Sequence, residues 1–491
     1  MSAKSKLTIE RLWAVFAEIE ATEQLVQWQI GAIYLWPLIR ASLMREVAEK
    51  LGVFEPRPPQ PALVTTDAKG LKQWVAELGE TPYAVVPFVR RNAAGLDPFS
   101  TYLVDAIRDH GHTPLIFGLG PSDEGSGRPQ VEHLERAFLK QFRNRAKLMV
   151  APTLRVSHKA KYARVIDHIE TQLAPFAEKA EVALASITGP YRRFPRWLLV
   201  EFYAQRLGWQ RFFAAAGVRK IFMVNAWKRA MIAGAQMAGA TVVEPMHGAI
   251  SSIHPYLSWS GADWVAYQPD ELLEWGPYWG DVAELPKTTV RKTIGAPEAM
   301  VAAFEREVEL EAQDEAHLTN TVLIASQAHV TKKLTRFLLT AAAEHPNFIF
   351  TLKQHPQEAP VDFEAVARNG FRKGKVASAK VPGNLILAKP EANTLELMMR
   401  SEFVLGVYTT ALFEAFALGC KVGVLDFSGW HHIRQLVDRG DAQLIEGQRG
   451  LVKFLKTAGT PKGLADRQRA GYYYAPPASD AELWHAIKIA E

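Results

Sequence analysis

The feature that most constrains the fold is a strand–helix–strand unit at residues 401–427, which reads SEFVLGVYTTALFEAFALGCKVGVLDF. A short apolar run at 404–408 has the composition of a buried parallel strand. Thr409 and Thr410 follow where a helix N-cap belongs, and Gly419 stands where a left-handed residue ends a helix. Because strands joined through a crossover helix pair in parallel, this unit predicts a parallel sheet covered by helices.

The start of that helix is also an expected anion site. A helix N-terminus offers main-chain N–H groups and the positive end of a dipole. The hydroxyls of Thr409 and Thr410 add donors at the same point. One interpretation of the unit is therefore a phosphate cradle without a glycine-rich loop, and the other is an ordinary crossover with a threonine cap.

The rest of the chain continues the alternation in two series. Further strands are expected at 83–89, 114–118, 221–225, 241–245, 321–325, 347–352 and 384–387. Alternating strands and helices predict an α/β fold with two Rossmann-like parallel-sheet domains facing a cleft. The predicted parts are a helical N-terminal segment at 1–60, an N-terminal domain at 61–295 with a helical insertion at about 127–215, and a C-terminal domain at 296–491. The last helix is expected to pack back on the first domain.

Composition limits the classes of partner and compartment. The 491 residues carry a net charge of +5, which suits a phosphorylated substrate or an anionic membrane surface but is too small to indicate nucleic acid. Cys420 is the single cysteine, which excludes an internal disulfide and favours a reducing cytoplasm. No signal peptide and no apolar run long enough to span a bilayer are recognised.

Polar side chains follow three expected strands of the second half. Hydroxyl and amide groups follow 321–325, a lysine and a histidine follow 347–352, and two threonines follow 404–408. Because ligands of open α/β sheets bind beyond the carboxyl ends of the strands, these groups predict an anionic ligand held by the second domain. The predicted donor-binding residues are Ser326, Gln327, Lys353, His355, Thr409, Thr410 and Glu414.

The first half carries a similar set of polar strand ends, expected around an acceptor. Its members are Arg90, Asn225, His247, Gly248 and His254. Asp97 follows the strand at 83–89 and is a candidate general base. The alternative for His247 is a cap of the turn before Gly248, and the alternative for Asp97 is a turn or helix cap.

Three motifs carry a family resemblance. They are the K-x-H-P element of Lys353, His355 and Pro356, the threonine pair within VLGVYTTALFEAFALG, and the strand end Met246-His247-Gly248, where Met246 replaces the glutamine of a Q-H-G element. Through these motifs the sequence resembles bacterial GT-B glycosyltransferases over roughly residues 80–440. The resemblance is to the capsule and O-antigen polysaccharide transferases related to Kdo-transferases and sialyltransferases.

The resemblance implies roles for individual residues. It implies that Thr409, Thr410 and His355 bind the phosphate of a nucleotide-activated donor, and that an N-domain carboxylate is the base. Asp97 matches that base best by position, with Asp105 and Glu244 behind it. The implied reaction is a metal-independent, inverting transfer of a sugar to a surface polysaccharide or lipid-linked glycan. No cofactor and no metal are expected, because a lysine, a histidine and a helix terminus can neutralise the leaving phosphate.

Two other functions remain open from the sequence. A phosphoribosyl or glycerol-phosphate transferase of polysaccharide assembly would use the same cradle, and a non-catalytic nucleotide-sugar-binding protein would need no base. A membrane role is a separate alternative. Residues 191–213, YRRFPRWLLVEFYAQRLGWQRFF, mix arginines with aromatic side chains as a bilayer-interface helix does. A core helix under the strand at 221–224 is the favoured interpretation, so peripheral contact with the cytoplasmic membrane stays an alternative.

Overall fold

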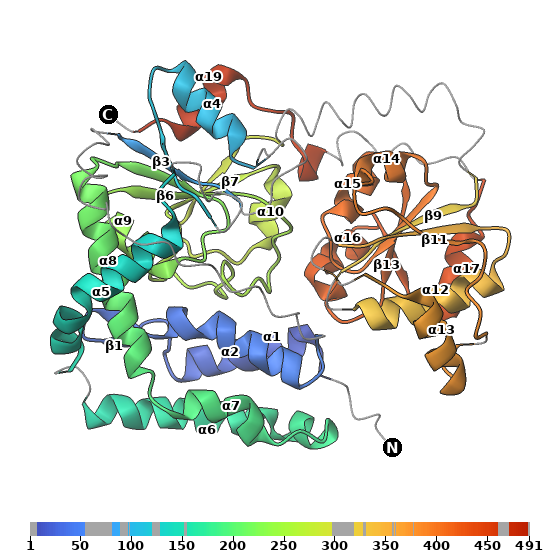
Figure 1. Ribbon diagram of the computed structural model, residues 1–491, viewed down its shortest axis with the longest axis horizontal. Coiled ribbons are helices and arrows are strands. Elements are labelled where there is room, and N and C mark those ends of the chain that lie inside the picture. The colour runs from blue at the N-terminus through green and yellow to red at the C-terminus, as the bar shows by residue number, and fades with distance from the viewer. Residues whose placement is uncertain are drawn as a thin grey trace. The chain divides into compact units, whose positions relative to one another are not determined.

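The structure is a computed structural model that describes residues 7–54, 81–88, 97, 99–119, 128–151, 155–296, 319–327, 330–355, 358, 360–376, 378–459 and 471–489. The chain forms two compact units (Figure 1). Unit N comprises Arg11–Val47, Pro61–Pro297 and Pro476–Glu491, and unit C comprises Met1–Glu10, Ala48–Gln60 and Glu298–Ala475. The helix expected at 298–316 lies outside the described residues.

Unit N is built on a six-stranded parallel sheet in the order β4-β3-β5-β6-β7-β8. The strands are β3 (Tyr83–Val86), β4 (Leu115–Ile116), β5 (Lys220–Met223), β6 (Thr241–Pro245), β7 (Glu271–Glu274) and β8 (Val290–Thr293). The chain adds β4 on one side of β3 and all later strands on the other. The strand order therefore reverses between β3 and β5, which is where an open α/β sheet opens a crevice at its carboxyl edge.

Helices make up most of the rest of unit N. They are α4 (Thr101–Asp109), α5 (Val131–Val150), α6 (Val156–Lys179), α7 (Leu184–Arg192), α8 (Arg196–Ala215), α9 (Arg229–Met237), α10 (Pro277–Val282) and α19 (Asp480–Ile487). Val85 and Val243 of the sheet share a buried cluster with Ile107 of α4 and Ile487 of α19. The expectation that the last helix packs on the first domain is thus confirmed. The N-terminal pair α1 (Ile9–Thr22) and α2 (Trp36–Lys50) is joined by the hairpin of β1 (Gln29–Ile30) and β2 (Ile33–Tyr34).

The 191–213 segment is exposed at its start, where Trp197 has an exposed fraction of 70%, and is packed inside unit N along the rest of α8. Helix α8 packs against α5 and α9, and its side chains Leu199, Trp209 and Phe213 are fully buried. A Cβ at Gly208 would clash with the ring of Phe138, so glycine lets α5 approach closely here. For α8, the core-helix interpretation of the sequence is confirmed.

Unit C is built on a second six-stranded parallel sheet, in the order β11-β10-β9-β12-β13-β14. The strands are β9 (Thr321–Ala325), β10 (Ile349–Lys353), β11 (Leu385–Leu387), β12 (Phe403–Gly406), β13 (Lys421–Leu425) and β14 (Gln443–Ile445). In chain order this is the 3-2-1-4-5-6 arrangement of dinucleotide-binding sheets, with the reversal between β9 and β12.

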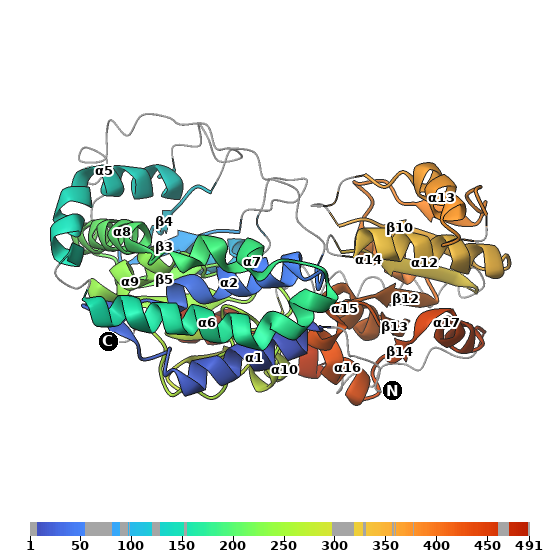
Figure 2. The ribbon, with the colours of Figure 1, turned by 90° about the horizontal axis from the view of Figure 1, so that it is seen from below.

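Helices flank the second sheet as well (Figure 2). They are α12 (Thr331–Glu344), α13 (Phe363–Arg372), α14 (Thr394–Met399), α15 (Ala411–Ala417), the 3₁₀ helix Trp430–Ile433, α16 (Arg434–Asp438) and α17 (Gly447–Leu455). Ile324, Leu352 and Leu405 of the sheet pack with Leu338 of α12 and Leu451 of α17. Apolar strands buried in this way explain why the alternation was readable in the sequence.

Three outer strands were not predicted. β7, β8 and β14 are three or four residues long, and β8 reads VRKT with its side chains largely exposed. Ion pairs support it instead of apolar burial, since Lys292 Nζ lies 2.9 Å from Glu271 and Arg291 Nη2 lies 3.1 Å from Glu274. A charged edge strand lacks the apolar run by which strands are recognised.

Two separate parallel sheets, each flanked by helices, are the two Rossmann-like domains of a GT-B fold, so the predicted fold class is confirmed. Across the described ranges, no helix is both long and apolar enough to cross a membrane.

Candidate functional site

The carboxyl edge of the unit C sheet gathers the three predicted motifs. Lys353 lies opposite Ala325, and Leu405 lies opposite Ile324. The residues that follow β10, β9 and β12 therefore emerge side by side, at the point where the strand order reverses. This juxtaposition was expected from the sequence, and the parallel register provides it.

Four donors at this edge converge on the carboxylate of Glu358. The Ser326 and Thr331 hydroxyls donate to Glu358 Oε2 at 2.9 and 3.1 Å, and the Gln354 amide approaches it at 3.5 Å. The main-chain N–H of His355 donates to Oε1 at 3.3 Å. Burial raises the pKa of Glu358 and the donors oppose the rise. The arrangement is an anion-binding set beside the first turn of α12, and neither Thr331 nor Glu358 was identified from the sequence.

Gln327 has a structural task at the same edge. Its amide nitrogen donates to the Tyr408 carbonyl at 2.7 Å, and its amide oxygen accepts the Tyr408 N–H at 3.1 Å. The side chain thereby extends the β9–β12 ladder across the reversal point. Gln327 thus links the residues after β9 with the residues after β12. This role differs from the predicted direct contact with a donor.

Lys353 and His355 bond to different partners in the structure. Lys353 Nζ donates to the carbonyls of Lys389 at 3.2 Å and Pro390 at 2.5 Å, so its charge supports the loop after β11. His355 contributes its main-chain N–H to the anion-binding set. Pro356, the last member of the K-x-H-P element, lies outside the described residues.

A short helix follows Thr409 and Thr410. α15 has seven residues, and Gly419 with a φ of 77° follows it as predicted. Thr409 Oγ1 accepts the Ala411 N–H at 3.3 Å, while the Thr410 hydroxyl bonds Glu414. Burial raises the pKa of Glu414 to about 7. The Thr409 bond favours the threonine-cap interpretation, whereas Thr410, at the N-cap itself, forms no side-chain cap bond.

In unit N, His247 and Glu244 form a pair at the end of β6. His247 Nδ1 lies 3.8 Å from Glu244 Oε1, and the exposed fractions of the two side chains are 22% and 4%. The His247 ring packs 5.1 Å from the ring of Phe88. Burial raises the pKa of Glu244 to about 7, and the charge of Arg229 opposes the rise. A part-exposed imidazole with a buried carboxylate behind it is an arrangement that can accept a proton.

Asp97 is placed as a cap. Its carboxylate accepts the N–H groups of Phe88 at 2.6 Å and Phe99 at 2.9 Å, and it also bonds the Ser100 hydroxyl. With an exposed fraction of 2% and these bonds, Asp97 holds the loop between β3 and α4, as its cap alternative predicted. It acts on His247 indirectly, because the Phe88 and Phe99 rings both pack against the imidazole. Asp105 is exposed on α4, with Arg108 3.9 Å away.

The other predicted residues of unit N have separate settings. Asn225 lies two residues after β5 in the left-handed region at a φ of 62°, and a Cβ added at Gly248 would meet no atom within 4 Å. Space is therefore open next to the imidazole. His254 Nδ1 accepts the Leu257 N–H at 3.2 Å, so this histidine stabilises a turn. Arg90 lies outside the described residues.

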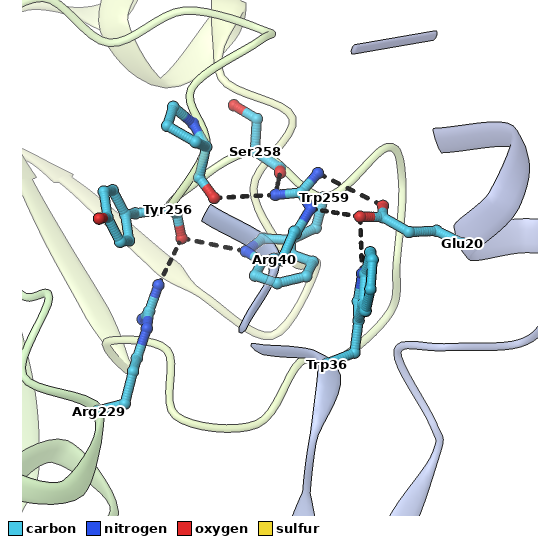
Figure 3. A network of polar contacts seen from close by, with 8 residues as sticks. Glu20, Trp36, Arg40, Arg229, Tyr256, Ser258 and Trp259 are labelled. Atoms are coloured by element: carbon cyan, nitrogen blue, oxygen red, sulfur yellow. Dashed lines mark hydrogen bonds and ion pairs between the residues drawn. The ribbon is translucent and has the colours of Figure 1, made fainter. Parts of the chain in front are cut away.

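Two buried arginines anchor the segment that follows His247 (Figure 3). Arg40 of α2 donates to the carbonyls of Pro255 and Ser258, each at 3.0 Å, and pairs with Glu20 of α1. Arg229 of α9 donates to the Tyr256 carbonyl at 3.0 Å. The sequence alone did not identify Arg40, because the partners of a buried arginine lie far away along the chain. The N-terminal helices thus help to build the carboxyl edge of the first sheet.

No group of three His, Cys, Asp or Glu side chains arranged to hold a metal ion occurs in the part of the chain that the structure describes.

The raised pKa of Glu244 gives a pH-dependent prediction. A group whose folded pKa lies above its unfolded value stabilises the fold fully below the unfolded pKa of 4.5, and this contribution is lost as the pH rises through about 7. Relative to wild type, Glu244→Gln is expected to gain about 2–3 kcal/mol of unfolding free energy between pH 5 and pH 8. Urea unfolding followed by tryptophan fluorescence measures this gain. The signal reports mainly on unit N, because Trp430 is the one tryptophan of the sequence within unit C. Asp105→Asn on the surface is the control, and an equal effect of Glu244→Gln at both pH values would contradict the prediction.

Comparisons with known proteins show no family for this chain. No protein-family model matches the sequence, and no curated protein is similar to it. Similar solved structures include UDP-GlcNAc 2-epimerase from Neisseria meningitidis bound to UDP-GlcNAc (11% identity, 79% of this chain and 96% of that chain, TM-score 0.38). They also include S. aureus MnaA with UDP (11%, 83% and 95%, 0.45) and an α,α-trehalose-phosphate synthase from Burkholderia vietnamiensis (13%, 83% and 94%, 0.40). The fold assignment rests on the two sheets themselves.

Proposed function

We propose that the protein is a GT-B glycosyltransferase that moves a sugar from a nucleotide-activated donor to a hydroxyl of a bacterial surface polysaccharide or lipid-linked glycan. Unit C binds the phosphates of the donor, and unit N binds the acceptor and supplies the base. The single observation that carries the proposal is the donor set of Ser326, Thr331, Gln354 and the His355 N–H, which converges on an anion where the strand order reverses.

The chemistry of that set fits a diphosphate. Hydroxyl, amide and N–H donors bind phosphate oxygens as they bind the Glu358 carboxylate, and hydrogen bonds to charged acceptors are the stronger kind. The same donors stabilise the negative charge that grows on the leaving phosphate.

The transfer is an inverting displacement. His247 takes the proton of the acceptor hydroxyl, the acceptor oxygen forms a bond to the anomeric carbon, and the bond from that carbon to the phosphate oxygen breaks. The nucleotide leaves with the electron pair. Glu244 orients the imidazole and stabilises its protonated form, and Asp97 keeps Phe88 and Phe99 against the ring. His247 therefore replaces Asp97 as the proposed base.

Donor binding tests the proposal. In a thermal-shift screen of UDP, GDP, CMP and phosphoribosyl pyrophosphate, a nucleotide is expected to raise the melting temperature of the full-length protein. The double variant Ser326→Ala, Thr331→Val is expected to raise the dissociation constant for that nucleotide about tenfold or more, because each lost hydrogen bond ends on a charged phosphate. The Glu358→Gln variant is expected to bind that nucleotide more tightly, since the substitution removes the carboxylate charge that lies among the donors.

The control is Thr340→Val, which removes a hydroxyl of α12 that bonds Arg336 O within the helix at 3.3 Å. Stabilisation by none of the nucleotides would contradict the proposal. Stabilisation by phosphoribosyl pyrophosphate alone would favour a phosphoribosyl transferase. Nucleotide binding without transfer to any glycan acceptor would favour a binding protein.

A further inference from the structure

One surface of unit N combines positive charge with exposed apolar side chains. We call it the basic tip: α5 from Arg136 onward and α6 as far as Arg164, which meet at the left edge of Figures 1 and 2. The sequence has no Asp or Glu between Glu135 and Asp167. In that stretch eight cationic side chains are exposed, namely Arg136, Lys140, Arg143, Arg145, Lys147, Arg155, Lys159 and Arg164.

The cations of the basic tip lack a counter-charge among the side chains that the structure describes. Elsewhere in unit N, arginines and lysines pair with carboxylates, as Arg192 does with Glu170 and Lys228 with Glu135. None of the eight cations forms an ion pair with an acidic side chain of the described ranges, although each has a long, exposed side chain that could reach one. Their charge therefore acts outward, and an anionic partner would meet it unopposed.

Strongly exposed apolar side chains occur on α5, on α6 and at the start of α8. Val156, Leu148 and Trp197 have exposed fractions of 83%, 75% and 70%, the highest of the large apolar side chains in the described residues. Val156 starts α6, and Leu148 lies in the last turn of α5. Trp197 lies in the first turn of α8. The start of α8 is held close to α6 because Phe194 packs edge-to-face on Tyr162, with ring centres 5.4 Å apart. Clustered exposure of this kind marks an interaction surface.

The start of α6 also lacks the features that usually stabilise a helix N-terminus. Helix N-termini favour acidic residues and side-chain caps, but α6 has no acidic residue in its first turn and its N-cap Arg155 forms no side-chain cap bond. Arg155 and Lys159 instead add positive charge where the helix dipole is already positive. The residues of this turn suit the binding of external anions better than the stability of the helix.

We infer that the basic tip docks the protein on an anionic lipid bilayer. The cations bind lipid phosphates while their alkyl stems lie along the interface, and Leu148, Val156 and Trp197 enter the headgroup–acyl boundary. A bilayer fits better than nucleic acid, because side chains as apolar as valine and leucine are exposed on the same two helices as the cations. The inference goes beyond the proposed sugar transfer and does not depend on it.

Vesicle flotation of the full-length protein tests the inference. Binding is expected to vesicles of phosphatidylcholine with about one third phosphatidylglycerol, to fall with salt over the range in which charges are screened, and to be weak on phosphatidylcholine alone. The charge variant Arg143→Gln, Arg145→Gln, Lys147→Gln, Arg155→Gln is expected to lower the partition coefficient about a hundredfold or more. The tip variant Leu148→Ser, Val156→Ser, Trp197→Ser is expected to lower it about tenfold or more. All seven side chains are exposed, so both variants are expected to fold.

The matched control removes four cations from an exposed basic cluster of unit C, as Arg368→Gln, Arg372→Gln, Lys373→Gln, Lys375→Gln. It changes net charge equally and is expected to leave binding within about threefold of wild type, since charge acts locally in salt. Equal losses in the control and the charge variant would overturn the inference by showing that only net charge matters. No binding of wild type to anionic vesicles would overturn it, and so would a tip variant that binds normally but changes the oligomeric state, which would assign the surface to a second copy.

Discussion

Arg40→Met is expected to lower the unfolding free energy of unit N by about 3–5 kcal/mol, because it leaves the Glu20 carboxylate buried without its cation. Arg40 is almost fully buried and its guanidinium lies between the rings of Trp13 and Trp259, at 4.3 and 4.1 Å. It also satisfies two carbonyls of the segment after His247. The shift in the urea midpoint of tryptophan fluorescence measures the loss.

Two further variants make this result specific. The double variant Glu20→Gln, Arg40→Met is expected to recover part of the loss, since the orphaned charge is removed. Arg108→Met on the exposed face of α4 makes the same exchange at the surface and is expected to change stability by about 0.5 kcal/mol or less. An Arg40→Met protein as stable as Arg108→Met would show that the buried pair contributes little.

His247→Asn is expected to lower the turnover rate of sugar transfer about 10²–10⁴-fold while leaving the dissociation constant of the nucleotide unchanged. The imidazole is the proposed base, and asparagine has a similar size but no basic nitrogen. Initial rates with a saturating donor, together with direct nucleotide titration, separate the two effects.

Glu244→Gln provides an intermediate case. It keeps the imidazole but removes the carboxylate 3.8 Å from Nδ1, so a smaller fall in rate and an altered pH–rate profile are expected. His110→Asn, which changes an exposed histidine stacked on Trp484, is the control for substitution itself. Transfer by His247→Asn within about threefold of wild type would remove this histidine from the reaction.

The candidate site was only partly predictable from sequence. Strand ends carrying Ser326, Thr409 and His247 were recognisable because parallel sheets bind ligands at that edge. Glu358 was missed, because a lone glutamate after a proline turn has no pattern until Ser326 and Thr331 are folded around it. Gln327 was assigned to ligand contact, whereas its amide completes a strand ladder that only the folded sheet creates.

The sequence by itself determined the two α/β series, the helical insertion and the polar edge of each sheet, since local apolar runs and turn residues encode them. Short charged strands such as Val290–Thr293 escaped it, because ion pairs with a neighbouring strand support them. Only the tertiary structure decided which polar groups already have partners inside the protein. Asp97 caps a loop, Arg40 anchors another, and Glu244 lies behind His247. The physical reason is that the partners of a buried polar group are distant in sequence and become neighbours only when the chain folds.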